Sequence, residues 1–370
     1  MKKYTTLFPE CERVHLKKDV GMLQYSLGKH CNYETELLSY ENESFSADDI
    51  EKFNIITIRK KHGDIIDFAV YLFKYGRKID ILNLYHITSR RNVFWIIVYK
   101  FINPRGHIHL KLDADYRMLD IIDVHPKGLI KKLKLYILRN KVDLYTAESQ
   151  HIRKILEDRW ELDIKLLPNG VYREIPISPA QTSQKENYFL TVGRLGTEQK
   201  ATGDLLDAYK LIKDKTEWML YLVGPIENSF HEHIKLFLDE NPDLKKRIVI
   251  KGNISDSSIL TELYIGAKVF VLPSKWESFA LVLMEALECG DYLIMSDRVP
   301  SADDISNNGK YASVVPFHDI EKLSEEMLAS TKLSVSDNGL KEMYDWIQDN
   351  FSWKSIVIRL DEYLSELATG

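Results

Sequence analysis

The sequence predicts an α/β protein with two doubly wound domains, each a parallel sheet covered by helices on both faces. Short β-branched and aromatic runs alternate with helical stretches in both halves of the chain, which is the pattern of parallel sheets. The 370 residues are too many for one ordinary core. A polar segment with two prolines and no periodicity separates the halves at residues 175–187 and predicts a linker.

The expected elements follow in order. In the first half we expect a helix at 65–75 and strands at 4–8, 36–39, 54–58, 79–84, 107–112 and 144–146. In the second half we expect helices at 202–213, 229–240 and 257–265, and strands at 188–192, 218–223, 247–250, 269–272 and 292–295. The predicted domains are residues 1–178 and 179–350, with a C-terminal helix at 351–370 that returns to the first domain.

Composition narrows the class of protein. Hydrophobic content of 45% and charged content of 28% are typical of a soluble globular protein, and a net charge of −5 gives no overall attraction to nucleic acid. The three cysteines, Cys11, Cys31 and Cys289, form no close pair, which argues for a reducing compartment and against a zinc site. The N-terminus lacks the apolar segment of a signal peptide, so we expect a cytoplasmic protein.

The segment 269–290 predicts a buried strand, a polar turn, a helix and a glycine stop. Glu277 and Glu285, eight positions apart, would fall near one helical face. The first amides of a helix lack partners and carry a positive partial charge, so they can bind phosphate while the acids bind neighbouring hydroxyls. Solvated acids on an ordinary amphipathic helix are the alternative. The amides concerned belong to Ser278, Phe279, Ala280 and Leu281.

A second candidate follows the first strand of the second domain. Gly193 would let the backbone approach a ligand closely, and Arg194 and Lys200, six residues apart, could hold two phosphates. Two solvated surface cations are the alternative. The segment has neither a Gly-x-Gly-x-x-Gly fingerprint nor a Walker loop, which argues against a nicotinamide cofactor and ATP hydrolysis.

Taken in order, these motifs resemble the donor domain of the family 4 retaining glycosyltransferases, which are group 1 glycosyltransferases with the GT-B fold. The resemblance is dense in the C-terminal half and loose in the N-terminal half. It implies two Rossmann-like domains facing across a cleft, the first on the acceptor side and the second binding a nucleotide-sugar donor. The matching motifs are Gly193-Arg194-Leu195, Lys200, Leu222-Val223-Gly224, Lys251-Gly252, Pro273-Ser274, Glu277 with Glu285, Gly290, Pro168-Asn169-Gly170-Val171 and Asn350-Phe351-Ser352-Trp353.

The resemblance also implies roles for individual residues. Arg194 and Lys200 would hold the donor diphosphate and stabilise the leaving nucleotide, Glu277 would contact hydroxyls of the donor sugar, and Glu285 would hold the ribose. Amides from Phe279 to Leu281 would complete the phosphate site. The base would be received around Lys251, Asn253 and Ile254.

In the first domain the match is weaker. Gly21 corresponds to a glycine loop that closes over the phosphates, although one glycine stands where many members have two. Asp113 occupies the place where many members have a histidine near the reacting carbon. It could orient the acceptor or a donor hydroxyl, or it could cap the following helix; Lys111 is a second candidate.

We expect no metal and no other cofactor. Asp113-Ala114-Asp115 spells the Asp-x-Asp triplet with which another glycosyltransferase fold holds a divalent cation. Here Arg194, Lys200 and a helix N-terminus would already neutralise the departing diphosphate.

The basic segment 127–141 contains no acids and places Leu129, Ile130, Leu133, Tyr136 and Ile137 on one helical face. Two interpretations fit: the helix rests on anionic lipid, at the inner face of the membrane, or it packs its apolar face on the sheet and exposes its charges. We expect the apolar side to pack on the sheet.

We therefore expect a metal-independent, retaining hexosyltransferase. It would use a UDP-sugar in preference to a GDP-sugar and act on a hydroxyl of a glycan, glycolipid or glycoprotein in cell-surface glycan assembly. One alternative is a GT-B binding module that holds a nucleotide-sugar or glycan and assists a partner glycosyltransferase. A hydrolase or epimerase on the same fold is another.

Overall fold

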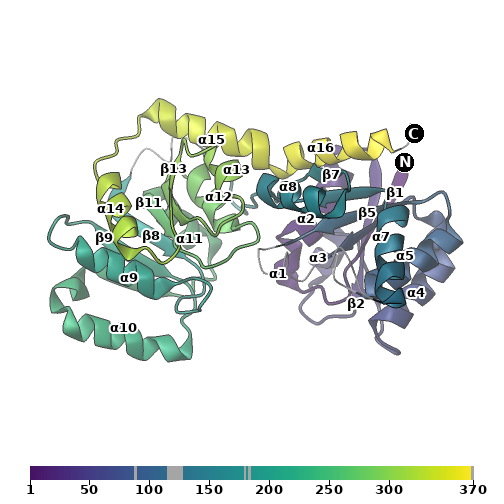
Figure 1. Cartoon of the computed structure of the whole chain (residues 1–370), viewed down its shortest axis with the longest axis horizontal. Coiled ribbons are helices and arrows are strands. Elements are labelled where there is room, and N and C mark those ends of the chain that lie inside the picture. Colours follow the sequence, from purple (N-terminus) through teal and green to yellow (C-terminus); the bar gives the residue numbers. More distant parts are fainter. Residues whose placement is uncertain (87–89, 115–127, 179–180, 182–184, 368–370) are drawn as a thin grey trace. The chain divides into compact units, whose positions relative to one another are not determined.

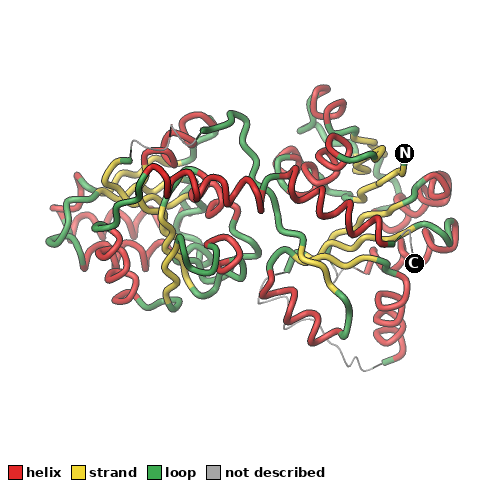
Figure 2. The backbone as a smooth tube through the Cα atoms, turned by 90° about the horizontal axis from the view of Figure 1, so that it is seen from above, coloured by secondary structure: helices red, strands yellow, loops and turns green. Residues whose placement is uncertain are grey.

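The computed structural model describes residues 1–86, 90–114, 128–178, 181 and 185–367. The chain forms two compact units, one from Met1–Tyr172 with Phe351–Gly370 and the other from Arg173–Asn350. Each unit is a parallel sheet with helices on both faces (Figure 1; Figure 2). The predicted α/β class with two doubly wound domains is therefore confirmed.

Unit 1 contains a seven-stranded sheet in the order β3-β2-β1-β4-β5-β6-β7, with parallel pairing throughout the described strands. The strands are β1 (Lys2–Leu7), β2 (Tyr33–Tyr40), β3 (Ile55–Ile58), β4 (Ile81–Tyr85), β5 (His107–Leu112), β6 (Leu144–Ala147) and β7 (Ile164–Leu166). The helices are α1 (Arg13–Leu16), α2 (Asp19–His30), α3 (Ala47–Lys52), α4 (Asp64–Tyr75), α5 (Arg90–Ile102), α7 (Leu129–Lys141), α8 (Gln150–Trp160) and α16 (Trp353–Glu366).

The two faces of the unit 1 sheet bury separate apolar cores. One core packs under α4, α5, α7 and α8 and includes Phe68, Trp95 and Leu138. The other packs under α2 and α16 and includes Leu23 and Leu360. The C-terminal helix α16 therefore completes the covering of unit 1, and Tyr33 fixes it by donating a hydrogen bond of 2.8 Å to the Asp361 carboxylate.

Unit 2 contains a six-stranded sheet in the order β10-β9-β8-β11-β12-β13, again parallel throughout the described strands. The strands are β8 (Glu186–Val192), β9 (Met219–Val223), β10 (Ile248–Gly252), β11 (Ala267–Leu272), β12 (Tyr292–Ser296) and β13 (Ala312–Val315). The helices are α9 (Thr202–Leu211), α10 (Asn228–Glu240), α11 (Ser257–Gly266), α12 (Leu281–Glu288), α13 (Ala302–Ser306), α14 (Ile320–Ser330) and α15 (Asp337–Phe351). Continuous apolar runs such as β11 are typical of strands covered on both faces.

Most predicted elements agree with these bounds, but two short strands escaped prediction. β7 and β13 have only three and four residues, and so few residues give no usable periodicity. The predicted linker also ends too late, because β8 already begins at Glu186. Among the described helices, none is both long and apolar enough to cross a bilayer.

Glycines bring the loops after β8 and β9 together. Gly224 has φ +131°, and a Cβ atom there would lie 1.8 Å from the carbonyl oxygen of Gly193. The N–H of Gly193 in turn donates to the carbonyl of Val223 at 2.9 Å. Only a residue without a side chain permits this approach.

We predict that Gly224→Ala lowers the free energy of unfolding by about 3 kcal/mol, because strain at positive φ and a backbone clash add. Gly252→Ala is the matched control, since Gly252 also has positive φ (+65°) but meets no atom within 4 Å. It should lose only about 1 kcal/mol. Urea titrations compare the two, and equal losses would contradict the close approach of the loops.

Candidate active site

The strand order of unit 2 places a topological switch point between β8 and β11. From β8 the chain continues outward to β9 and β10, whereas β12 and β13 lie beyond β11 on the other side. In open parallel sheets, ligands bind at such a point, beyond the carboxyl ends of the strands. The segments that leave the sheet there are 193–200 after β8 and 273–280 after β11.

An ion pair joins these two segments. Lys200 Nζ lies 2.5 Å from Glu277 Oε1, and the side chains are 15% and 8% exposed. The same Oε1 accepts a 2.7 Å hydrogen bond from the hydroxyl of Ser274, while Oε2 accepts one of 3.4 Å from Gln199. A buried ion pair is stable only with such additional partners. A carboxylate has about four acceptor positions, so Glu277 can still accept a hydrogen bond from a hydroxyl.

Gln199 links the two segments again and was missed by sequence analysis. Its side-chain amide donates to the carbonyl of Trp276 at 3.1 Å, and its backbone carbonyl accepts from the N–H of Lys275 at 2.8 Å. Its side-chain oxygen accepts from the guanidinium of exposed Arg194 at 2.7 Å. Arg194, Lys200 and Glu277 are therefore brought together, as the sequence predicts. Nothing in the sequence pattern marks Gln199, because two of its partners are backbone atoms of a segment more than 70 residues away.

Two serines fix the turn that carries Glu277. The hydroxyl of Ser296, at the end of β12, donates to the carbonyl of Ser274, and the hydroxyl of Ser301 donates to the carbonyl of Phe279. Ser274 is fully buried and Phe279 nearly so. The turn is therefore held from the end of β12 and from the start of α13, in addition to its contacts with Gln199 after β8.

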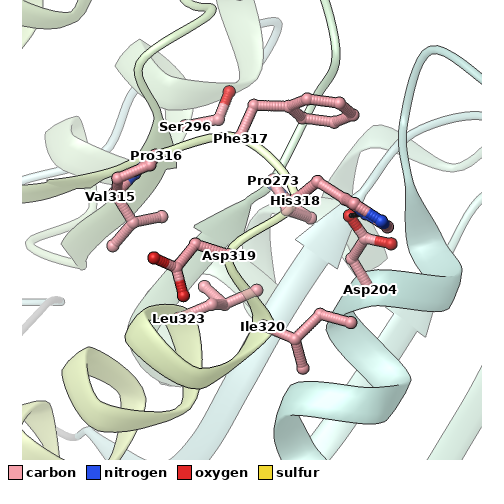
Figure 3. Close-up of a pocket in the computed structure, with 10 residues that line it drawn as sticks. All are labelled: Asp204, Pro273, Ser296, Val315, Pro316, Phe317, His318, Asp319, Ile320 and Leu323. Carbon is pink, nitrogen blue, oxygen red and sulfur yellow. Dashed lines mark hydrogen bonds and ion pairs between the residues drawn. The ribbon is translucent and has the colours of Figure 1, made fainter.

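A small cavity lies beside this turn at the ends of β11, β12 and β13 (Figure 3). Its volume of about 10 Å³ is near the lower limit for one water molecule, so it cannot hold a nucleotide. At its rim, His318 Nδ1 lies 2.9 Å from Asp204 Oδ2. The hydrogen bond to the Asp204 carboxylate raises the pKa of His318 above its ordinary value.

The helix after this turn begins later than predicted. α12 starts at Leu281, and Ala280 before it has the left-handed φ of +64°. The argument that placed Glu277 and Glu285 on one helical face is therefore wrong, because Glu277 precedes the helix. Ser278, Phe279 and Ala280 also precede it. Leu283 already donates to the carbonyl of Ala280 at 3.0 Å, so the first amides of the helix are those of Leu281 and Val282. The predicted glycine stop is confirmed: Gly290 has φ +83°.

The remaining donor-side candidates lie around the same edge of the sheet. Glu285, on the second turn of α12, accepts a 2.8 Å hydrogen bond from the hydroxyl of Tyr264 and is partly buried. Lys251 is the last residue but one of β10 and is exposed. Its ammonium lies 5.6 Å from the ring centre of Tyr221. Exposed Asn253 and partly buried Ile254 follow β10.

In unit 1, Gly21 is part of a helix and not of a loop. It lies in the first turn of α2, where a Cβ atom would come within 2.4 Å of the Leu16 backbone. Its small size therefore serves the packing of α2 on α1. Partly buried Asp113 follows β5. The helix that it was expected to cap, and Asp115, lie outside the described residues.

A buried charged cluster lies at the carboxyl ends of β5 and β6; sequence analysis named its Lys111 as a candidate but missed Glu148. Lys111 is fully buried, and its ammonium lies 2.7 Å from Glu148, 2.8 Å from the side-chain oxygen of Asn169 and 3.2 Å from Asp19. Burial raises the pKa of Glu148 to about 8, and the charges of Asp113 and Asp19 add to this, against the ammonium of Lys111. No described residue bonds to Glu148 Oε2. Because Asp19 is the first residue of α2, Lys111 ties that helix to the sheet.

Comparison with known proteins identifies the class. Residues 174–342, nearly all of unit 2, match the family model "Glycosyl transferases group 1". Solved structures of the same fold include a glycosyltransferase from Rickettsia africae (TM-score 0.74, 16% identity, 99% of this chain and 98% of that one) and the lipopolysaccharide outer core galactosyltransferase WaaB (TM-score 0.72, 16% identity, 99% of both chains). Unit 2 therefore matches the group 1 glycosyltransferases over nearly its whole length, and the whole chain has the predicted GT-B fold.

Three relatives are similar in sequence. An uncharacterized 41.2 kDa protein in the cps region of Klebsiella pneumoniae is 25% identical over 267 residues, 69% of this chain and 70% of its own length. The glycosyltransferase AmsD of amylovoran biosynthesis in Erwinia amylovora is 35% identical over 173 residues, 42% of this chain and 44% of its own. The O-antigen chain mannosyltransferase B of Escherichia coli is 27% identical over 164 residues, 42% of either chain.

We predict that Glu148→Gln becomes more stable relative to the unchanged protein as the pH rises from about 5 to about 8. The raised pKa of Glu148 means that, within this range, the folded state keeps a proton that the unfolded state has released. Rising pH therefore lowers the free energy of unfolding through this group, and glutamine removes that loss. Urea titrations at both pH values measure the difference. Glu10→Gln, at an exposed position, is the control, and the same pH trend in both variants would contradict the prediction.

Proposed function

We propose that this protein is a retaining hexosyltransferase that uses a nucleotide-diphosphate sugar, a UDP-sugar in preference to a GDP-sugar. The observation that carries the proposal is the convergence of Arg194, Lys200 and Glu277 at the switch point of unit 2. Two cations beside a carboxylate that still has acceptor capacity suit a diphosphate next to a sugar hydroxyl.

In the proposed reaction, the bond between the anomeric carbon and the diphosphate breaks, and the acceptor hydroxyl attacks from the same face. The departing diphosphate oxygen takes the proton of that hydroxyl, so the α configuration is kept. Arg194 and Lys200 stabilise the charge that develops on the diphosphate, together with the first amides of α12. Such electrostatic stabilisation by fixed groups is usually the largest contribution to rate.

The contacts of the ion pair suggest how the donor is positioned. The ion pair with Glu277 holds Lys200 beside the turn after β11. Hydrogen bonds from Ser274 and Gln199 hold Glu277 in place. The free acceptor position of Glu277 would receive a donor sugar hydroxyl, and Glu285 the ribose. Lys251, Asn253 and Ile254, at the end of β10, would border the base. Asp113, which follows β5, would orient the acceptor or a donor hydroxyl.

The proposed donor and acceptor rest on the relatives. HepE of Anabaena, whose fold is similar (TM-score 0.71, 14% identity, 99% of this chain and 100% of that one), was solved with UDP and glucose. By their names, AmsD acts in amylovoran biosynthesis, and the other relative is an O-antigen chain mannosyltransferase. We therefore propose that the acceptor is a glycan, glycolipid or glycoprotein of cell-surface assembly. As a separate proposal, the enzyme is cytoplasmic. Because two side-chain cations serve the diphosphate, the proposal requires no divalent metal.

We predict that Arg194→Ala and Lys200→Ala each lower kcat for glycosyl transfer by a factor of roughly 10² to 10³, the loss typical of one stabilising donor. Glu277→Gln should lower transfer as well, because it releases Lys200. Transfer is measured with radiolabelled UDP-sugars and cell-wall glycolipid extracts. The control is Lys275→Ala, on the same turn, whose exposed ammonium pairs with Glu198. Binding of donor with no transfer to any acceptor would instead indicate a binding module, and donor cleavage without acceptor a hydrolase.

We also predict that UDP raises the unfolding temperature more than GDP does. A ligand at a hundred times its dissociation constant adds about 2.7 kcal/mol to the free energy of unfolding. Thermal-shift measurements with UDP, GDP and their sugars test this, with Arg194→Ala as the variant that should lose the shift. An equal or larger shift with GDP would refute the preference for UDP.

A further inference from the structure

Three neighbouring helices of unit 1 each carry a second apolar stripe in addition to the one that packs on the sheet. α4 contacts α5, and α5 contacts α7, on the same side of the sheet (Figure 1). The stripes on the three helices are exposed, and we call them together the α4–α5–α7 face. The side chains of these stripes are large and apolar, and soluble proteins normally bury such side chains.

The stripes on α4 and α5 follow helical spacing. In α4, Phe68 and Leu72 are fully buried, whereas Val70 and Phe73 on the opposite side are 61% and 69% exposed. In α5, Trp95, Ile96 and Tyr99 are buried, whereas Phe94, Ile97 and Phe101 are exposed, the last by 78%. Each helix is therefore apolar on two opposite sides, which a single contact with the sheet does not require.

α7 continues this surface and corrects the expectation that its apolar side packs on the sheet. Only Ile137 and Leu138, near its C-terminal end, are buried. Leu129 and Ile130, in its first turn, are 83% and 85% exposed, and Leu133 and Tyr136 are more than half exposed. Most of the apolar residues that the sequence assigns to one face therefore point away from the core of unit 1.

The charges around this face are positive. α7 has no acidic residue, and its Lys131, Lys132 and Lys141 are exposed, as is Lys74 in the last turn of α4. The two acids of α4 are engaged: Asp64 pairs with Arg91 at 2.7 Å, and Asp67 is buried and accepts from three backbone N–H groups. No carboxylate of these three described helices is exposed.

We propose that the α4–α5–α7 face docks on an anionic lipid bilayer. Exposed apolar side chains surrounded by lysines are the composition of surfaces that lie in the interface of a membrane, with the cations attracted to acidic headgroups. A second copy of the chain fits less well, because a twofold contact would set the same lysines of both copies against each other. The proposal does not rest on the glycosyltransferase activity and concerns another part of the fold.

The test is co-sedimentation of the full chain with large vesicles of pure phosphatidylcholine and of phosphatidylcholine with roughly one third phosphatidylglycerol, the fraction at which anionic surface potential is substantial. We expect binding to the anionic vesicles and little binding to the neutral ones. The double variant Lys131→Gln/Lys132→Gln should bind about 30-fold more weakly, from about 1 kcal/mol per cation and 1.4 kcal/mol per tenfold. Phe73→Ser/Leu133→Ser should also lose binding.

The control is Leu211→Ser/Leu236→Ser, which removes two apolar side chains of similar exposure from unit 2; it should bind like the unchanged protein. Thermal unfolding verifies that every variant is folded. Absence of binding to anionic vesicles, or equal binding by all variants, overturns the proposal. So does a dimer in light scattering that Phe73→Ser/Leu133→Ser dissociates while vesicle binding is absent, because that result assigns the face to a second copy.

Discussion

The ion pair between Lys200 and Glu277 is the interaction on which the candidate site depends. It joins the segment after β8 to the segment after β11, which are far apart in sequence but neighbours in the sheet. Removing water from two charges is unfavourable, and Ser274 and Gln199 offset this by bonding to the same carboxylate. The site is therefore preorganised: its charges are held by the fold before a donor arrives, so little reorganisation is needed when the diphosphate departs.

Unit 1 uses buried charge in a different way. Lys111 lies among Glu148, Asn169 and Asp19 and fastens the first turn of α2 to the strands β5 and β6. Here one ammonium faces several carboxylates, and burial, with a smaller contribution from the charges of Asp113 and Asp19, raises the pKa of Glu148. The two units thus share an architecture, but in unit 2 the charged groups stay partly accessible to a ligand, whereas in unit 1 Lys111 is enclosed. The outer surface of unit 1 adds a separate feature, an exposed apolar face with lysines.

The sequence predicted the α/β class and most strands because parallel strands are continuous apolar runs between helical patterns. The resemblance of its motifs to the group 1 glycosyltransferases also predicted that Arg194, Lys200 and Glu277 share one site. The sequence could not locate Gln199 or Glu148, because the importance of both arises from contacts and burial among segments that are far apart in the sequence. It placed the start of α12 too early, since the left-handed Ala280 gives no local signal. It also assigned the apolar side of α7 to the core, because periodicity tells which residues share a face but not what that face contacts.

A double-mutant cycle on kcat/KM, with Lys200→Met, Glu277→Gln and the pair, tests most directly whether the segments after β8 and β11 form one donor site. If they do, the two side chains act as a unit, and the loss in the double variant is clearly smaller than the product of the two single losses. The expected coupling is about 1 kcal/mol or more, within the range for residues in contact. Losses that simply multiply, or single variants with unchanged transfer, would show that the ion pair is structural and that the donor binds elsewhere.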